Sequence, residues 1–226
     1  MNAIVISDLH IGSKYFHRQQ FKRFLDHLPE AYVLVLNGDI IECPISKLKP
    51  NDQRILNQIK EISSRQTVIW VQGNHDVGFI PQSFGSVLQK PMHIFENRLL
   101  ITHGDKFDAV MPQNRAFMKA FRLLHAMRVR FGAKPVHVAE YAKKWESFYR
   151  VLRKNVMMNA VNYAHKKGFQ AVTCGHTHYV EDEIVNGIRY INTGAWTELP
   201  AHYLVINADN MRLEKLEHPL YGGHPG

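Results

Sequence analysis

The chain has 226 residues, of which 45% are hydrophobic and 21% are charged, and its formal net charge is +8. These proportions are ordinary for a globular protein. No apolar run approaches the ~20 residues that a membrane-spanning helix needs, so the sequence excludes such a helix. The two cysteines, Cys43 and Cys174, exclude a disulfide framework, and Met1 leads into a predicted strand without the cationic segment of a signal peptide. We therefore expect a cytoplasmic protein.

The first third of the chain predicts alternating strands and helices. Short apolar runs at residues 3–7, 32–36 and 67–72 are typical of buried strands. Between them, apolar residues recur at helical spacing over residues 21–28 and 55–62. This βαβαβ order predicts a parallel sheet that is covered by helices.

The rest of the chain predicts more strands and a helical insertion. Residues 99–102 and 170–174 read as strands, and shorter ones follow at 179–185, 188–192, 202–207 and 211–216. Asn186-Gly187 is a hairpin signal, so we expect this half to be antiparallel. We predict one α/β domain over residues 1–226, with a helical insertion at about 108–168 that forms a lid.

Side chains that can bind a metal follow the predicted strands. An isolated aspartate at such a place is more often a turn or capping residue, and an isolated histidine is more often structural. Here the pattern recurs strand after strand, and open α/β sheets place their ligands at the carboxyl ends of strands. The seven candidate ligands are Asp8, His10, Asp39, Asn74, His103, His176 and His178.

The donor types indicate the metal and the chemistry. A mixed set of carboxylate, imidazole and amide donors suits Mn²⁺, Fe or Zn²⁺ better than Mg²⁺ or Ca²⁺. Seven ligands suit two divalent ions that share a carboxylate, and such a pair, ~3.5–4 Å apart, assists phosphoryl displacement. We expect two ions, Mn²⁺ first. We predict His75, Asn74 and Asp76 as catalytic residues: Asn74 also as a ligand, His75 acting on the phosphate or leaving group, and Asp76 orienting that imidazole.

The basic charge is concentrated in the insertion. Residues 104–169 contain fourteen lysines and arginines against four acids, a net charge of +10 that exceeds the +8 of the whole chain. A solvated helix face is one explanation. The other is that basic residues hold an anionic substrate, and the candidates are Arg115, Lys119, Arg122 and Arg153.

The candidate ligands stand in five short sequence blocks. In chain order the blocks are Asp8-Leu9-His10, Gly38-Asp39, Gly73-Asn74-His75-Asp76, His103-Gly104-Asp105 and Gly175-His176-Thr177-His178. Together they resemble the blocks of the calcineurin-like metallophosphoesterases. The resemblance implies a β-sandwich flanked by helices. It implies that Asp8, His10 and His178 hold one metal, that Asn74, His103 and His176 hold the other, and that Asp39 bridges them, with His75 assisting at the phosphate.

Within that family the chain is similar to the UDP-2,3-diacylglucosamine pyrophosphatases of lipid A synthesis. The compact length, the insertion between His103 and His176, and the segment 194–198 carry this similarity, whereas His75 stands where those enzymes typically have arginine. The resemblance implies hydrolysis of a phosphoester or pyrophosphate bond in a phosphorylated small molecule or lipid-linked nucleotide. Peripheral contact with the inner membrane would then involve the basic insertion.

Two alternatives stay open. One is a nuclease or nucleotide phosphodiesterase that uses the same two-metal site, with the basic insertion on the nucleic-acid backbone. The sequence contains no recognisable nucleic-acid-binding module in its support. The other is a non-catalytic interaction scaffold, which the complete ligand set disfavours.

Overall fold

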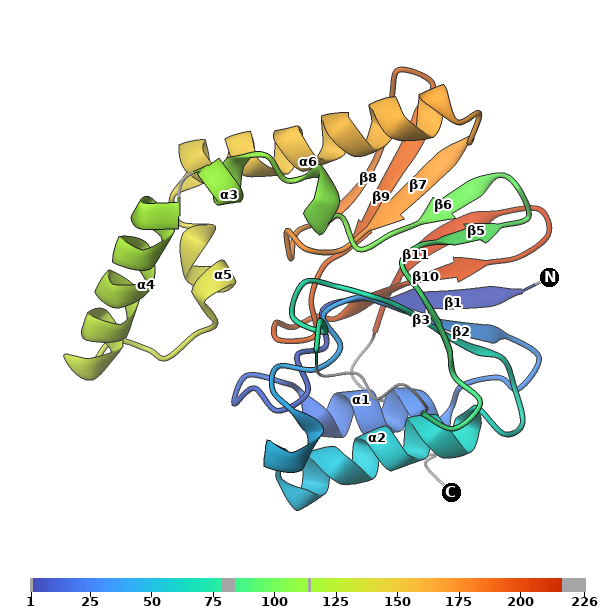
Figure 1. The fold of residues 1–226 in the computed structure, drawn as a ribbon, viewed down its shortest axis with the longest axis horizontal. Coiled ribbons are helices and arrows are strands. Elements are labelled where there is room, and N and C mark those ends of the chain that lie inside the picture. Colours follow the sequence, from blue (N-terminus) through green and yellow to red (C-terminus); the bar gives the residue numbers. More distant parts are fainter. Residues whose placement is uncertain (1, 79–83, 114, 217–226) are drawn as a thin grey trace, which may run out of the picture.

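The computed structural model describes residues 2–78, 84–113 and 115–216, without the side chains of residues 113–118. Its strands form two stacked sheets, with helices outside them (Figure 1). The first sheet has six strands in the order β11-β10-β1-β2-β3-β4, and the second has five in the order β5-β6-β7-β9-β8. The predicted α/β sandwich with flanking helices is confirmed.

The first sheet contains the predicted βαβαβ unit. Strands β1 to β4 run parallel, and β10 and β11 extend the sheet in antiparallel pairing beyond β1. Helices α1 and α2 are the crossovers, and a short 3-10 helix, η1 (Ile45–Lys47), precedes α2. The elements are β1 (Ala3–Ile6), α1 (Arg18–Asp26), β2 (Val33–Asn37), α2 (Pro50–Ile62), β3 (Val68–Val71), β4 (Leu88–Lys90), β10 (His202–Ile206) and β11 (Met211–Lys215).

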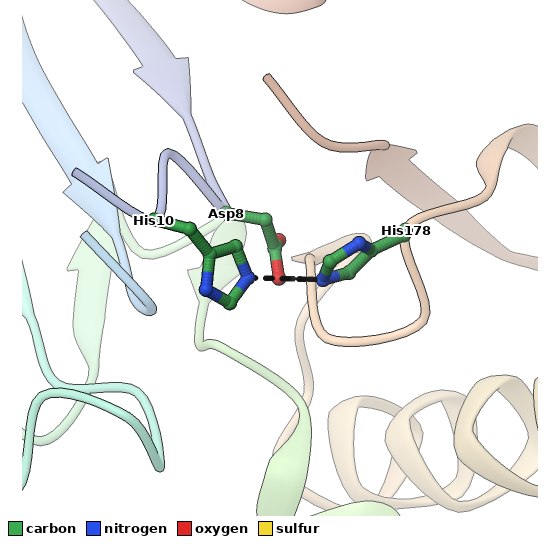
Figure 2. Close-up of side chains that lie close together, drawn as sticks. All are labelled: Asp8, His10 and His178. Carbon is green, nitrogen blue, oxygen red and sulfur yellow. Dashed lines mark hydrogen bonds and ion pairs between the residues drawn. The ribbon is translucent and has the colours of Figure 1, made fainter. Parts of the chain in front are cut away.

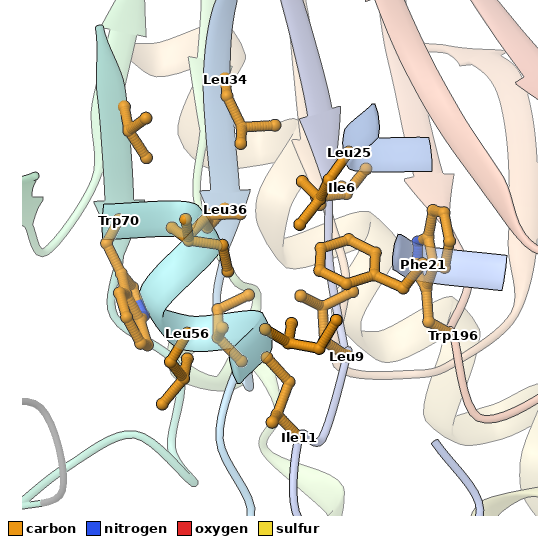
Figure 3. Packing of buried hydrophobic residues seen from close by; sticks show 14 of the residues in the cluster. Ile6, Leu9, Ile11, Phe21, Leu25, Leu34, Leu36, Leu56, Trp70 and Trp196 are labelled. Atoms are coloured by element: carbon orange, nitrogen blue, oxygen red, sulfur yellow. The ribbon is translucent and has the colours of Figure 1, made fainter. Parts of the chain in front are cut away.

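Both faces of this sheet are buried, which explains why its strands are continuous apolar runs. In β1, Ile4 and Ile6 face the core beneath α1 and α2, whereas Ala3 and Val5 face the core between the sheets. Trp196 reaches the first core from the end of the chain and packs edge-on against Phe21, with ring centroids 5.0 Å apart (Figure 3). This packing fixes the carboxyl ends of β1 to β3 relative to one another.

The second sheet corrects part of the sequence prediction. Strand β7 pairs in parallel with both β6 and β9, so the second half of the chain is mixed rather than antiparallel. The helical crossover between β6 and β7 returns the chain to the same direction, and the β8–β9 hairpin places β9 rather than β8 beside β7. The strands are β5 (His93–Phe95), β6 (Leu99–Ile101), β7 (Ala171–Cys174), β8 (Val180–Val185) and β9 (Ile188–Thr193).

Two short strands, β4 and β5, were not predicted. Each has three residues, too few to produce a periodic pattern, and most of those residues are partly exposed. They pair with β3 and β6 respectively, at the edges of the two sheets.

Helices lie between β6 and β7, where the sequence predicted them. Helix α6 covers the outer face of the second sheet, whereas α4 and α5 extend beyond the sheets (Figure 1). None of the helices in the described ranges is long and apolar enough to cross a bilayer. The segment consists of η2 (Asp105–Phe107), α3 (Val110–Gln113), α4 (Arg115–Arg130), α5 (Val138–Ala142) and α6 (Glu146–Lys166), and residues 110–166 are called the insertion below.

Candidate metal centre

The seven predicted ligands follow the carboxyl ends of parallel strands from both sheets. Asp8 and His10 follow β1, Asp39 follows β2, and Asn74 follows β3. From the second sheet, His103 follows β6, and the pair His176 and His178 follows β7. The sandwich brings these strand ends together at one end of the molecule, as expected for parallel strands.

Asp8, His10 and His178 form the first ligand group. The three buried side chains point toward one another (Figure 2). His178 Nε2 lies 3.2 Å from Asp8 Oδ1 and 3.1 Å from His10 Nε2. Two imidazole nitrogens facing each other beside a carboxylate are a donor set that a divalent cation can satisfy. The trio predicted to hold one metal is therefore assembled, while its metal binding stays a prediction.

One oxygen of Asp39 faces two parts of the site. Asp39 Oδ2 lies 3.2 Å from His103 Nε2, 4.0 Å from His10 Nε2 and 4.0 Å from His75 Nε2. Its other oxygen accepts a hydrogen bond of 2.8 Å from the backbone amide of His75. The position of Oδ2 between His10 and His103 suits a carboxylate that is shared by two cations.

Asn74 and His176 lie on the far side of the centre. Asn74 Oδ1 is 3.1 Å from His176 Nδ1, and the His103 and His176 rings meet edge-on with centroids 5.4 Å apart. Asp108 Oδ2 lies 2.9 Å from His176 Nε2, which leaves Nδ1 directed at Asn74. The second predicted trio, Asn74, His103 and His176, thus lies together on one side of Asp39. Asp108 was not predicted as a site residue.

The donors fit a bound cation. The Nδ1 atom of His103 donates to the carbonyl oxygen of Asn37 at 3.1 Å, so Nε2 is the ring nitrogen that can bind a proton or a metal ion. That Nε2 is buried, has no hydrogen-bond partner among the described residues, and faces the Asp39 carboxylate. A lone pair opposite a carboxylate is unfavourable unless a proton or a metal ion lies between them. A metal ion would satisfy both.

The backbone of the centre is strained. Asp8, His10, Asp39, His176 and His178 all adopt left-handed conformations, with φ between 50° and 65°. Non-glycine residues in this region cost about 1–3 kcal/mol each and cluster at functional sites. Glycines supply the necessary space, because a Cβ atom at Gly175 would overlap Asp8 Oδ2.

The electrostatics of the centre favour cations. Burial alone would raise the pKa of Asp39, but the nearby imidazoles, His103 foremost, outweigh it and hold the pKa well below its usual range. Burial opposes the charged form of His103, yet Asp39 and Asp8 together raise its pKa to about 10. A buried pocket that stabilises two carboxylates and an added positive charge is suited to a divalent ion.

Glu42, rather than Asp76, orients the imidazole of His75. Glu42 Oε2 lies 3.2 Å from His75 Nδ1 and 2.7 Å from His10 Nδ1, so it positions both rings. The hydrogen bond with Glu42 is the largest cause of the raised pKa of His75. The prediction that Asp76 orients His75 is wrong. Its buried carboxylate accepts hydrogen bonds from the amides of Ile40, Ile41 and Gly73 and from the indole of Trp70.

The insertion holds the loop that carries His176 and His178. Lys143, at the end of α5, donates to the carbonyl oxygen of His178 at 2.6 Å and to Glu198 Oε2 at 2.7 Å. Tyr149 in α6 donates to the carbonyl oxygen of Thr177. His137, which begins α5, stacks on the ring of His178 with centroids 5.2 Å apart. These three contacts were not predicted, since no sequence motif surrounds any of the three residues.

A cavity of about 110 Å³ opens at the centre. Ligands and His75 line one side, and apolar insertion residues such as Phe121 and Leu152 line the other. Of the predicted substrate-binding residues, Arg122 lines this cavity, whereas Lys119 is exposed and is not among the described lining residues. The side chain of Arg115 lies outside the description. Arg153 is turned away, 3.3 Å from Glu181 and stacked over Tyr179.

Comparisons with known proteins agree with this fold. The sequence profile described as "Calcineurin-like phosphoesterase superfamily domain" matches residues 1–211. The chain is similar to Yfce, a phosphoesterase from E. coli, with 17% identity, a TM-score of 0.52 and coverage of 96% of this chain and 93% of that chain. It is also similar to Vacuolar Protein Sorting 29 from Cryptosporidium parvum, with 12% identity, a TM-score of 0.50 and 95% coverage of each. A search of curated proteins found no match.

Proposed function

This chain belongs to the calcineurin-like phosphoesterase superfamily, and on that premise we propose that it is a hydrolase that cleaves a phosphoester or pyrophosphate bond with two divalent metal ions. The position of Asp39 Oδ2, 3.2 Å from His103 Nε2 and 4.0 Å from His10 Nε2, is the observation that supports this most strongly. Imidazole and carboxylate donors favour Mn²⁺, with Fe or Zn²⁺ as substitutes.

The proposed chemistry divides between the ions and the chain. Two bound ions would lower the pKa of a water molecule and neutralise the phosphoryl charge. The Asp8 group and the group of Asn74, His103 and His176 would hold one ion each, with Asp39 between them. His75, whose pKa the hydrogen bond with Glu42 raises, would contact the phosphate or the leaving group.

For the substrate we propose a nucleotide-linked diphosphate that carries a lipid, such as UDP-2,3-diacylglucosamine. Arg122 lines the cavity from the insertion and supplies a cation for a phosphate that is not cleaved. Phe121 and Leu152 in the same cavity favour a substrate with apolar parts. The alternative, a nuclease or nucleotide phosphodiesterase, is supported by the +10 charge of residues 104–169.

We also propose contact with a membrane surface, the inner membrane on its cytoplasmic side, and one observation supports contact with an anionic lipid surface in general. Three residues on one side of α4, Leu123, Leu124 and Met127, are 63%, 55% and 46% exposed, and Phe131, directly after the helix, is 81% exposed. Exposed basic residues, including Arg130, flank this stripe. An apolar stripe with basic flanks suits an anionic lipid surface.

The membrane proposal is tested by sedimentation with vesicles of phosphatidylglycerol or phosphatidylcholine. We expect binding to the anionic vesicles, and we expect Leu124→Glu combined with Phe131→Ser to weaken it at least about tenfold, because each substitution removes apolar area that the membrane would bury. Ile184→Ser is the matched control, since Ile184 is 77% exposed but lies on β8. Equal binding by all three proteins contradicts the proposal.

The activity is tested on metal-free protein reloaded with Mn²⁺, Fe²⁺ or Zn²⁺. The substrates are 4-nitrophenyl phosphate, bis(4-nitrophenyl) phosphate, detergent-dispersed UDP-2,3-diacylglucosamine and single-stranded DNA. We expect metal-dependent turnover, fastest for the lipid-linked diphosphate. Faster cleavage of DNA favours the nuclease alternative, and the absence of turnover with every metal leaves only the non-catalytic scaffold.

A further inference from the structure

His137 is the one imidazole in the described part of the cavity wall that comes from the insertion. Its ring stacks on His178 with centroids 5.2 Å apart and an interplanar angle of 18°, and it lies 5.3 Å from the ring of His10. It therefore borders the first ligand group directly. In the described ranges, His137 does not belong to any group of side chains whose donor atoms lie within 4.8 Å of one another and could hold a metal ion.

The hydrogen bonding of His137 leaves one donor unused. The residue begins α5, and its Nδ1 accepts a hydrogen bond of 3.3 Å from the backbone amide of Ala139. Because Nδ1 accepts, the proton of the neutral ring lies on Nε2. Nε2 makes no hydrogen bond with any residue in 2–78, 84–113 and 115–216. The atom is not enclosed by the protein, and His137 lines the cavity, so Nε2 is open to a ligand.

Helix α5 is held against the first ligand group at both ends. His137 stacks on the His178 ring at its start, and Lys143 donates to the His178 carbonyl oxygen at 2.6 Å at its end. Because the capping residues on both sides of this five-residue helix contact His178, the side chain of His137, the N-cap, has little freedom. The Nε2–H group is therefore positioned before a substrate arrives, which is what an efficient hydrogen-bond donor to a reacting group requires.

We propose that His137 contacts the substrate, with its Nε2–H donating a hydrogen bond to a non-bridging oxygen of the phosphoryl group bound beside Asp8, His10 and His178. This inference rests on the proposed function, and it assigns part of the phosphate site to the insertion. His75, from the sandwich, lines the same cavity and faces Asp39 and Glu42. The phosphoryl group would then contact one imidazole from the sandwich and one from the insertion.

Two substitutions separate substrate contact from capping of α5. His137→Ser keeps a favoured helix-capping residue but removes the donor. His137→Gln keeps an N–H donor near the position of Nε2 but caps poorly. We expect His137→Ser to weaken the binding of inorganic phosphate to the Mn²⁺-loaded protein by about 10–100-fold, the effect of losing a hydrogen bond to a charged group, while His137→Gln stays within a few-fold of wild type. His165→Ser, at an exposed position of α6, is the control.

Calorimetric titration of phosphate and the number of Mn²⁺ ions per chain are measured together. The reverse order, with His137→Gln impaired and His137→Ser normal, overturns the inference in favour of a structural cap. Loss of a bound Mn²⁺ ion from His137→Ser overturns the inference, because His137 would then be a metal ligand. The absence of phosphate binding by wild type also overturns it. A wild-type protein that binds phosphate yet hydrolyses no ester refutes the proposed function alone.

Discussion

The two sides of the candidate site are built differently. The ligand side comes from strand ends packed between two cores, and its side chains, such as Asp8 and His103, are fully buried. The opposite side comes from helices whose outer residues are open to solvent, with Leu123 on α4 63% exposed. Dense packing fixes geometry, whereas sparsely packed elements open at lower free energy. The sandwich is thus suited to hold metal ions in place, and the insertion to adapt to a substrate.

Removing the shared carboxylate breaks the ligand side. Asp39→Asn keeps the shape of the side chain and removes its charge, so we expect kcat/KM to fall by about 10³-fold, since a metal pair contributes several kcal/mol to phosphoryl displacement. The metal content, measured by elemental analysis, should fall below two ions per chain. Asp182→Asn, at an exposed partner of Arg189, is the control and should change neither quantity. Full activity of Asp39→Asn would mean that this oxygen serves no cation.

Weakening the support of the ligands has a smaller effect. Glu42→Gln loses the carboxylate that faces His10 Nδ1 at 2.7 Å and His75 Nδ1 at 3.2 Å. We expect a loss of about 10–100-fold in Mn²⁺ affinity or in turnover, as is usual when a carboxylate behind a ligating histidine is removed. Titration of the metal-free protein with Mn²⁺ measures the affinity. An unchanged affinity together with unchanged kcat would restrict Glu42 to a structural role.

Substitutions on the insertion side should change substrate binding rather than metal binding. Arg122 lines the cavity but is exposed, so Arg122→Gln should raise KM by about 5–10-fold and lower kcat less, because solvent weakens the contact of this cation with a phosphate. Lys119 lies one turn earlier on α4, is exposed and carries the same charge, which makes Lys119→Gln the matched control. Equal effects of the two substitutions would indicate a general electrostatic attraction instead of a specific contact.

The difference between the ligand side and the insertion side also explains what the sequence could predict. Each ligand stands directly after an apolar run, so strand and donor are read together, as with Asp39 after the strand at 33–37. Three further residues reach the centre only through tertiary contacts, and no pattern of apolar residues in the sequence indicates them: Glu42, Asp108 and His137. Asp76 was assigned to His75 by proximity in sequence, but the tight turn directs its carboxylate back to the amide of Gly73. The parallel pairing of β7 with β6 depends on the helical crossover between them. The pattern of apolar residues does not indicate the direction in which that crossover returns the chain.

The smallest expected effect concerns the junction between the two sides. Glu181 on β8 lies 3.3 Å from Arg153 on α6, and both carboxylate oxygens are buried without hydrogen-bond partners among the described residues. Burial raises the pKa of Glu181 from 4.5 to about 7, because Arg153 compensates only in part. The folded protein therefore holds a proton that the unfolded chain releases, so this contribution to stability is present below pH 4.5 and is lost as the pH rises through about 7.

Glu181→Gln removes that titration while keeping the shape of the side chain. We expect the variant and wild type to unfold at similar denaturant concentrations at pH 5, and the variant to be more stable by on the order of 1 kcal/mol at pH 8. Chemical denaturation at both pH values measures the difference. The opposite result would be a variant that loses stability relative to wild type between pH 5 and pH 8. It would show that the ion pair with Arg153 outweighs the burial of the carboxylate. The insertion would then be anchored to the second sheet by charge, and its attachment would weaken in high salt.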